Sequence, residues 1–188
     1  MKAVRIHEDG GPEVLRYEDV DDPAAGEGQV LIRLAAVSLN HLDVWVRKGL
    51  PSVPKPRILG ADGAGTVEAL GDGVTGFELG DRVVINPGLE HGDTIAVVGE
   101  HCDGTHAELI AIDAAQVFPL DDSLTFEQAA AFPLVYETAY RMLVTKAAVR
   151  EGQWALIWGL GGGVATAAFE SPGSARRRRS PRQGAART

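Results

Sequence analysis

The chain has 188 residues, of which 45% are hydrophobic, 23% are charged and 23 are glycine, and its formal net charge is −8. Such a length allows one large domain or one and a half ordinary ones, and the composition is typical of a soluble, loop-rich, partly β protein. Residues 1–170 hold all 26 acidic and 12 of the 18 basic residues, a net charge of −14 (12 − 26), which argues against a nucleic-acid partner.

The sequence offers no candidate for a membrane segment or a signal peptide. It is charged from Lys2 onward, and its longest uncharged stretch, residues 153–169, is broken by glycines. That stretch is also shorter than the roughly 20 apolar residues that a membrane helix needs. A single cysteine, Cys102, excludes an internal disulfide and fits a reducing compartment. We therefore expect a cytoplasmic protein with no membrane partner.

Residues 1–124 are predicted to form a compact β-barrel, because short apolar strands recur at intervals of roughly 10 residues. The candidate strands are Lys2–His7, Val14–Val20, Gln29–Leu39, Arg82–Asn86, Ala107–Ile112 and Val117–Leu120. Several glycines in Ile58–Gly71 indicate sharp bends or close backbone approach, as in a small barrel. Apolar spacing predicts a helix over Asn40–Lys48, which Gly49 ends.

The character of the sequence changes at Leu124. Ser123 is a candidate cap for a helix over Thr125–Phe132, with Gln128 near the capping-box position. Pro133 is expected to open a second helix, Leu134–Ala148. One face of that helix should carry Val135, Ala139, Met142 and Leu143.

Residues 154–169 have the pattern of a strand, a glycine turn and a helix. Trp154–Trp158 is typical of a strand buried on both faces of a parallel sheet, and four glycines follow within Gly159–Gly163. A helix is expected from Val164 onward, so that the turn forms a nest of backbone N–H groups for a diphosphate. A glycine-rich turn without a ligand is the alternative, and the nest interpretation requires a strand beginning at Trp154.

Beyond Phe169 this pattern ends. Residues 171–188 contain six arginines and no apolar residue larger than alanine. A disordered basic tail accounts for that composition. A frameshifted or truncated C-terminus is a second hypothesis, because GC-rich DNA read in another frame encodes such residues.

Six motifs in order resemble the medium-chain dehydrogenases/reductases, on the branch of quinone oxidoreductases and alcohol-dehydrogenase-like proteins. They are Gly11–Leu15, Ser38–Asp43, Ile58–Gly65, Gly76–Val83, Gly104–Glu108 and the turn Gly159–Ala165. The resemblance implies a mixed β and α/β fold. A GroES-like barrel over 1–124 would supply the substrate side, 125–170 would hold bridging helices and an incomplete Rossmann unit, and 171–188 would be the tail.

The resemblance also bears on metals. Zinc-using members of the family carry a cysteine where this chain has Asn40, a His-Glu or His-Asp pair at Ala61-Asp62, and a third ligand near Leu134. Alanine and leucine cannot coordinate, and an amide is a poor zinc ligand, so we expect no metal site. The loop cluster of histidines and a cysteine is the rival metal site, and solvent-facing side chains are the alternative. Its members are His91, His101, Cys102 and His106.

The family reaction is hydride transfer between NAD(P)H and a quinone, enone, carbonyl or alcohol. Without zinc an isolated ketone lacks its Lewis acid, whereas a quinone or enone spreads the developing charge itself. The expected function is a zinc-independent quinone or enone reductase, as an incomplete chain with impaired activity, a homodimer when full length. An alcohol-dehydrogenase-like enzyme and a non-catalytic GroES-like module are the alternatives.

The resemblance suggests three catalytic candidates. Asn40 would hydrogen-bond substrate or nicotinamide ribose, or alternatively cap its helix. Asp43 would orient cleft residues, or alternatively suit the helix dipole. Tyr136, like Tyr140, would cover the ring or donate a proton, with aromatic core packing as the alternative; His41 is a further proton-relay hypothesis.

The resemblance places the cofactor contacts later in the chain. The expected cofactor-binding residues are Thr138, Gly159, Gly162, Gly163, Val164 and Ala165. A plain helix-surface threonine is the alternative for Thr138. The cofactor is NADP or NAD, with NADPH favoured by the family. The acidic residue that would read the adenosine ribose falls near residues 183–187, where none stands, so the two are not distinguished.

Overall fold

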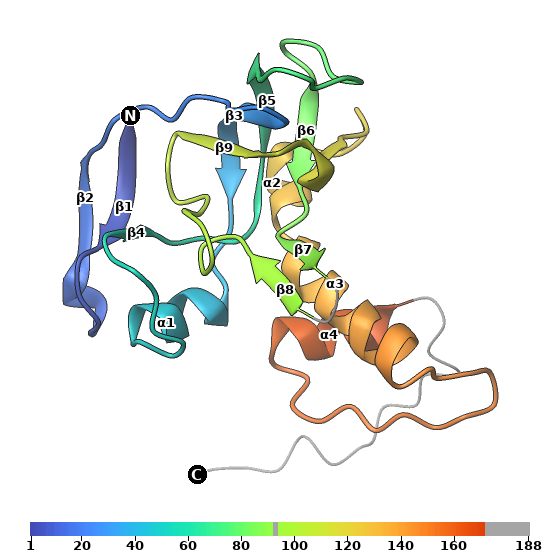
Figure 1. Ribbon diagram of the computed structural model, residues 1–188. Coiled ribbons are helices and arrows are strands. Elements are labelled where there is room, and N and C mark those ends of the chain that lie inside the picture. The colour runs from blue at the N-terminus through green and yellow to red at the C-terminus, as the bar shows by residue number, and fades with distance from the viewer. Residues whose placement is uncertain (92–93, 172–188) are drawn as a thin grey trace. The chain divides into compact units, whose positions relative to one another are not determined.

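The computed structural model describes residues 1–91 and 94–171 (Figure 1). The chain forms two compact units, Met1–Leu134 and a second that begins at Val135. Sequence analysis places a boundary after residue 124 instead; α2 (Phe126–Ala130) belongs with the first unit because it packs against that unit's strands. The arginine-rich tail lies, from residue 172 onward, outside the described residues.

The first unit contains two antiparallel sheets and a hairpin (Figure 1). The smaller sheet has the order β2 (Leu15–Asp19), β1 (Lys2–Ile6), β4 (Arg57–Ile58). The larger sheet has the order β10 (Val117–Pro119), β6 (Arg82–Ile85), β5 (Gly63–Leu70), β3 (Gln29–Val37), β9 (Leu109–Asp113). Short 3₁₀ turns cover Pro12–Val14 and Ala114–Gln116. The strands expected from sequence are thus confirmed to within a few residues.

Strand β3 organises the larger sheet. It pairs with β9 from Gln29 to Arg33 and with β5 along its length, where register shifts interrupt the ladder. Gly65 of β5 lies so close to β3 that a Cβ there would overlap the carbonyl oxygen of Arg33. The prediction of close backbone approach in this stretch is therefore confirmed, and it brings the end of β3 to the start of α1 (His41–Arg47).

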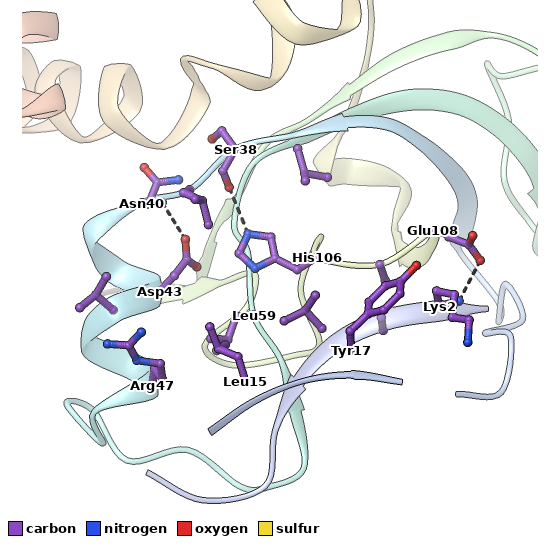
Figure 2. A pocket seen from close by; sticks show the side chains of 16 residues that line it. Lys2, Leu15, Tyr17, Ser38, Asn40, Asp43, Arg47, Leu59, His106 and Glu108 are labelled. Atoms are coloured by element: carbon purple, nitrogen blue, oxygen red, sulfur yellow. Dashed lines mark hydrogen bonds between the residues drawn. The ribbon is translucent and has the colours of Figure 1, made fainter. Parts of the chain in front are cut away.

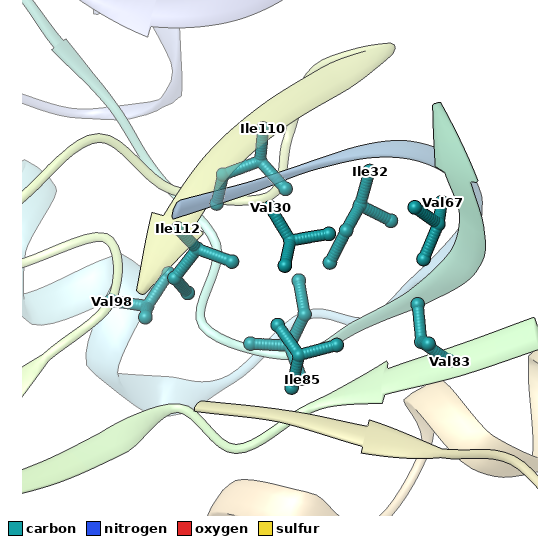
Figure 3. Close-up of a cluster of buried hydrophobic side chains, with 9 residues drawn as sticks. Val30, Ile32, Val67, Val83, Ile85, Val98, Ile110 and Ile112 are labelled. Atoms are coloured by element: carbon teal, nitrogen blue, oxygen red, sulfur yellow. The ribbon is translucent and has the colours of Figure 1, made fainter. Parts of the chain in front are cut away.

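The buried side chains in the core of the larger sheet are valines and isoleucines, which are β-branched (Figure 3). Its fully or almost fully buried members are Val30, Ile32, Val67, Val83, Ile85, Val98, Ile110, Ile112 and Val117. Side chains of this shape pack well on a pleated surface, and each contributes about 1.5–3 kcal/mol on burial. The barrel is therefore a rigid support for the loops and the helix at its end.

Helix α1 follows the prediction closely. Asn40 stands at its N-cap, and Asp43 in its first turn returns its carboxylate to the Asn40 backbone N–H. Gly49 follows the helix with φ +80°, a conformation that glycine adopts without strain. Val46 of this helix packs in a second small core with Ile6 and others.

The two helices after the barrel differ in detail from expectation. The N-cap of α2 is Thr125 and not Ser123, because Thr125 Oγ1 accepts the Gln128 backbone N–H and the Gln128 side chain returns to Thr125. α3 spans Pro133–Tyr140 and then becomes a π-helical segment, Arg141–Lys146. The wider π turn rotates the apolar face, and Met142, predicted to be on that face, is 56% exposed.

The predicted strand Trp154–Trp158 is wrong for this chain. These residues have no regular structure, and the side chains of Trp154 and Trp158 are 81% and 88% exposed. A strand buried on both faces requires neighbouring strands and covering helices, and the described residues after Val135 form no strand. The helix predicted after the glycines is confirmed as α4 (Gly163–Glu170), which packs on Ala139 of α3.

A hairpin between Asn86 and Cys102 was not predicted. β7 (Gly88–His91) and β8 (Thr94–Val97) pair antiparallel in the region that sequence analysis treats as a loop. Within residues 1–91 and 94–171, no helix combines the length and the apolar character that crossing a membrane requires.

Candidate functional site

A largely apolar cavity of about 600 Å³ opens in the first unit (Figure 2). Its walls come from β1, β2, the end of β3, α1 and the segment before β9. The apolar lining residues include Val4, Leu15, Val37, Leu39 and Val44. Its size and apolar character suit a ring-shaped organic molecule that a few polar groups orient.

The polar lining residues lie on two sides of this cavity (Figure 2). His106 contacts the backbone carbonyl oxygen of Ser38 through Nε2, at 3.2 Å. Arg47 of α1 has a buried Nε that makes no hydrogen bond. The Arg47 side chain also lines the cavity, so its guanidinium places a positive charge beside this apolar space.

Asp43 joins the start of α1 to the segment before β5. Its Oδ2 accepts the Asn40 backbone N–H at 2.7 Å, and its Oδ1 accepts the Gly60 N–H at 3.0 Å. The residue is only 6% exposed, so both N–H groups depend on it for a partner. Asp43 is a first-turn acid of α1 and also lines the cavity, and its role in orienting cleft residues stays a prediction.

Asn40 lines the cavity and also occupies the N-cap position, so its two alternatives are not exclusive. Its Nδ2 donates to Asp62 Oδ2 at 2.9 Å, and Ser38 Oγ donates to the same oxygen at 3.2 Å. The other oxygen, Oδ1, accepts the Leu134 backbone N–H at 2.9 Å. One carboxylate therefore binds the β3–α1 connection and the last residue of the first unit.

Burial raises the pKa of the Asp62 carboxyl above its ordinary value, and the nearby charge of Asp43 acts in the same direction. The hydrogen bonds from Asn40, Leu134 and Ser38 oppose this shift because they stabilise the ionised form. Asp62 is 1% exposed. A carboxylate at this depth is costly unless its lone pairs are satisfied, which explains the three donors around it.

The rival metal site, made of histidines and a cysteine, does not converge among the residues described. His106 faces the cavity, whereas His101 accepts the Val97 backbone N–H through Nδ1 at 3.0 Å, and Cys102 is exposed. The side chain of His91 lies outside the described residues. In the described part of the chain, no three His, Cys, Asp or Glu side chains are grouped to hold a metal ion. His41, the relay candidate, is exposed and packs against Trp45.

In the second unit, Tyr136 is engaged with α4. Its hydroxyl donates to Glu170 Oε2 at 2.6 Å, and this bond raises the pKa of the Tyr136 phenol. Tyr136 and Tyr140 are 37% and 60% exposed, so neither is a core residue. Thr138 is half-buried on α3.

The glycine turn before α4 has an open backbone. Gly159 has φ +76°, Gly162 is the N-cap of α4, and a Cβ at Gly159 or Gly161 would meet no atom within 4 Å. The first N–H groups of any helix lack intrahelical acceptors, here those of Gly163, Val164 and Ala165. The strand on which the nest interpretation depends is absent from the described residues, so the expected strand–turn–nest for a diphosphate is not formed as predicted.

Comparison with known proteins identifies the family. The alcohol dehydrogenase GroES-like domain matches residues 26–122, just over half of the chain. The chain belongs to the medium-chain dehydrogenases/reductases. Human quinone oxidoreductase is 37% identical over 173 residues, which are 90% of this chain and 49% of that protein.

Solved structures give the same family. An NAD-dependent alcohol dehydrogenase is 46% identical with a TM-score of 0.83, covering 90% of this chain and 54% of its own. A mycobacterial protein complexed with NADPH is 32% identical with a TM-score of 0.78, covering 90% and 48%. The chain thus spans about half the length of the curated relatives it matches.

The positions at which some family members bind catalytic zinc do come together in this structure. Asn40 and Leu134 each direct an N–H hydrogen at Asp62, and a cation would be repelled by hydrogens so placed. The side chains of Ala61 and Leu134 contain no ligand atom. This set of residues does not fit a tetrahedral zinc ion.

Three residues of the site were missed by sequence reasoning. Asp62 was considered only as a metal-ligand position, Ser38 only as part of a motif, and His106 only as a loop histidine. The signal that was present is the pair Ser38 and Asn40 at the end of a strand, whose polar side chains need a buried partner.

Proposed function

We propose that this protein is a zinc-independent, NAD(P)H-dependent reductase of quinones or conjugated enones. The observation that carries the proposal is the hydrogen-bonded Asn40–Asp62 pair at the family's zinc position. The apolar cavity beside it supports a flat, weakly polar substrate. A quinone or enone delocalises the charge that hydride addition creates, so hydrogen-bond donors suffice for its reduction.

In this proposal the first unit binds the substrate. The apolar walls exclude water from the ring, and the guanidinium of Arg47, which lines the cavity, supplies a charged group for the substrate oxygen. Asp43 keeps α1 and its Asn40 end in place through its two backbone contacts. These residues bind and orient, and none acts as a Lewis acid.

The second unit supplies the cofactor contacts. NAD(P)H, when bound, supplies the hydride. Its contacts would be the residues that the family resemblance implies, which are Thr138, Gly159, Gly162, Gly163, Val164 and Ala165, without the strand that completes the expected nest. NADPH is favoured because a mycobacterial relative is complexed with it. We expect slow turnover from these 188 residues, because the described residues 147–158, which lead into the glycine turn, form no strand.

An alcohol dehydrogenase is the second candidate, favoured by the 46% identity to an NAD-dependent member. The two candidates differ in substrate and cofactor. Oxidation of a secondary alcohol with NAD as acceptor would support the second, and it requires another group to polarise the alcohol oxygen. A GroES-like module without activity is the third, and it predicts no nicotinamide binding.

The test measures binding and turnover separately. Nicotinamide fluorescence is followed during titration with NADPH and with NADH, and NADPH consumption is then followed with 1,4-naphthoquinone or with a secondary alcohol and NAD. A Cys102→Ala variant serves as the control, because the exposed thiol adds to quinones. Naphthoquinone-dependent NADPH consumption in both proteins supports the proposal. Alcohol oxidation alone, or no nicotinamide binding, contradicts it.

A further inference from the structure

Asp62 is the most heavily bonded polar side chain of the site. Besides the three donors to its carboxylate, its backbone carbonyl oxygen accepts Thr105 Oγ1 at 2.8 Å. It forms no ion pair with any residue in 1–91 or 94–171. A buried carboxylate without a cation must be stabilised by hydrogens from its neighbours, so it dictates which way those neighbours turn.

The donor inventory of the two neighbours is small. Ser38 carries one polar hydrogen and Asn40 carries two on its amide. An ionised carboxylate only accepts, so one hydrogen of each is committed to Asp62 Oδ2. Of three side-chain hydrogens on this edge of the cavity, one remains for a ligand, whereas the lone pairs of Ser38 Oγ remain as acceptors.

His106 adds to this pattern. The partner of its Nε2 is the Ser38 backbone oxygen, which can only accept, so Nε2 carries the proton. In the neutral ring Nδ1 is then an acceptor. Figure 2 shows the His106 ring at the cavity, between Ser38 and the β1–β2 strands.

We propose that Asp62 is a positioning residue that turns the hydrogens of Ser38 and Asn40 inward, so that this edge of the cavity takes a hydroxyl hydrogen of the ligand. The edge then recognises a phenol, a hydroquinone or a sugar hydroxyl in preference to a bare carbonyl or ether. The inference rests on the proposed function only in taking this cavity as the substrate site. Its tests involve no turnover, so they fail or succeed independently of reductase activity.

The first test uses the wild-type chain. It contains two asparagines, Asn40 and Asn86, so selective ¹⁵N labelling gives two pairs of side-chain amide signals. At neutral pH we expect one Asn40 hydrogen to exchange slowly with solvent, because a bond to a buried carboxylate is strong. In Asp62→Asn this protection should be lost while the Asn86 signals stay unchanged. Equal, rapid exchange at both asparagines in the wild type would overturn the proposal.

The second test measures binding of 2-naphthol and of 2-methoxynaphthalene, which differ only in the hydroxyl hydrogen. We expect the wild type to bind 2-naphthol about 2- to 10-fold more tightly than 2-methoxynaphthalene, which is the effect of about one neutral hydrogen bond. Asp62→Asn should bring the two affinities within 2-fold of each other, because an amide at position 62 supplies its own hydrogens.

Two further variants keep the second test decisive. Asp103→Asn is the control, since Asp103 also accepts a backbone N–H, from Ile58 at 3.0 Å, whereas the cavity-lining Ser38 and Asn40 donate to Asp62. It should retain the wild-type preference. Ser38→Ala removes one acceptor without a buried charge, so it gives the answer if Asp62→Asn does not fold, and it should reduce the preference. No preference in the wild type, or an unchanged preference in Ser38→Ala and Asp62→Asn, would overturn the inference.

Discussion

Replacing Asp43 by alanine should destabilise the first unit strongly. The side chain is 6% exposed and accepts two backbone N–H groups, from Asn40 at 2.7 Å and from Gly60 at 3.0 Å. An unsatisfied buried donor costs about 1–3 kcal/mol, so losing both acceptor oxygens should lower the free energy of unfolding by about 2–6 kcal/mol. Asp43→Asn keeps one acceptor oxygen, and we expect about half that loss.

Equilibrium urea unfolding followed by far-UV circular dichroism measures these changes. Asp121→Ala is the matched control, because Asp121 also accepts a backbone N–H, from Ser123 at 2.8 Å, but at an exposed position. Water can replace the acceptor there, so the expected loss is below about 1 kcal/mol. If Asp43→Ala were no more destabilising than Asp121→Ala, the reasoning about buried donors at α1 would be refuted.

Three other predictions concern stability. The pKa of Asp62 in the folded protein lies above its ordinary 3.8, so folding favours the protonated carboxyl. The resulting contribution to the free energy of unfolding is complete below pH 3.8 and is lost as the pH rises through the pKa of the folded state. Urea unfolding at a series of pH values should therefore show wild type losing stability relative to Asp62→Asn as pH rises, and a difference of opposite slope would contradict this. Gly65→Ala should prevent folding or cost several kcal/mol through overlap with the Arg33 carbonyl, whereas Gly161→Ala, with open space around it, should change the midpoint little. Ile32→Ala, in the fully buried core, should cost about 2–5 kcal/mol by thermal or urea unfolding, and a loss below about 1 kcal/mol would mean that the core is not close-packed.

The sequence predicted the parts of the fold that local patterns determine. Strands such as Arg82–Ile85 and helix His41–Arg47 were found because apolar spacing and a terminal glycine act within a few residues. The cap of α2 was assigned two residues early, because Gln128 stands three residues after Thr125 and forms the reciprocal capping box with it and not with Ser123.

The strand over Trp154–Trp158 shows where local pattern fails. Its apolar run carries the right signal, but a central strand gains its stability from neighbours that the described residues do not provide. Hairpin β7–β8 is the opposite case, a structure that forms without a sequence signal. Gly88–His91 has little apolar alternation and pairs through its backbone.

The site was predicted only in part, for a similar reason. Asn40 and Asp43 lie in one motif, and their contact spans three residues. Asp62 is 22 residues from Asn40 and 72 from Leu134, so its central position follows from the fold and not from spacing. Its raised pKa likewise arises from burial, which no local pattern reveals.

Metal content of the purified protein, measured together with NADPH-dependent naphthoquinone reduction before and after chelation, tests the central claim most directly. The Asn40–Asp62 pair at the family's zinc position predicts no stoichiometric zinc and a rate that a chelator leaves unchanged. One tightly bound zinc per chain, whose removal abolishes the reaction, would contradict the account.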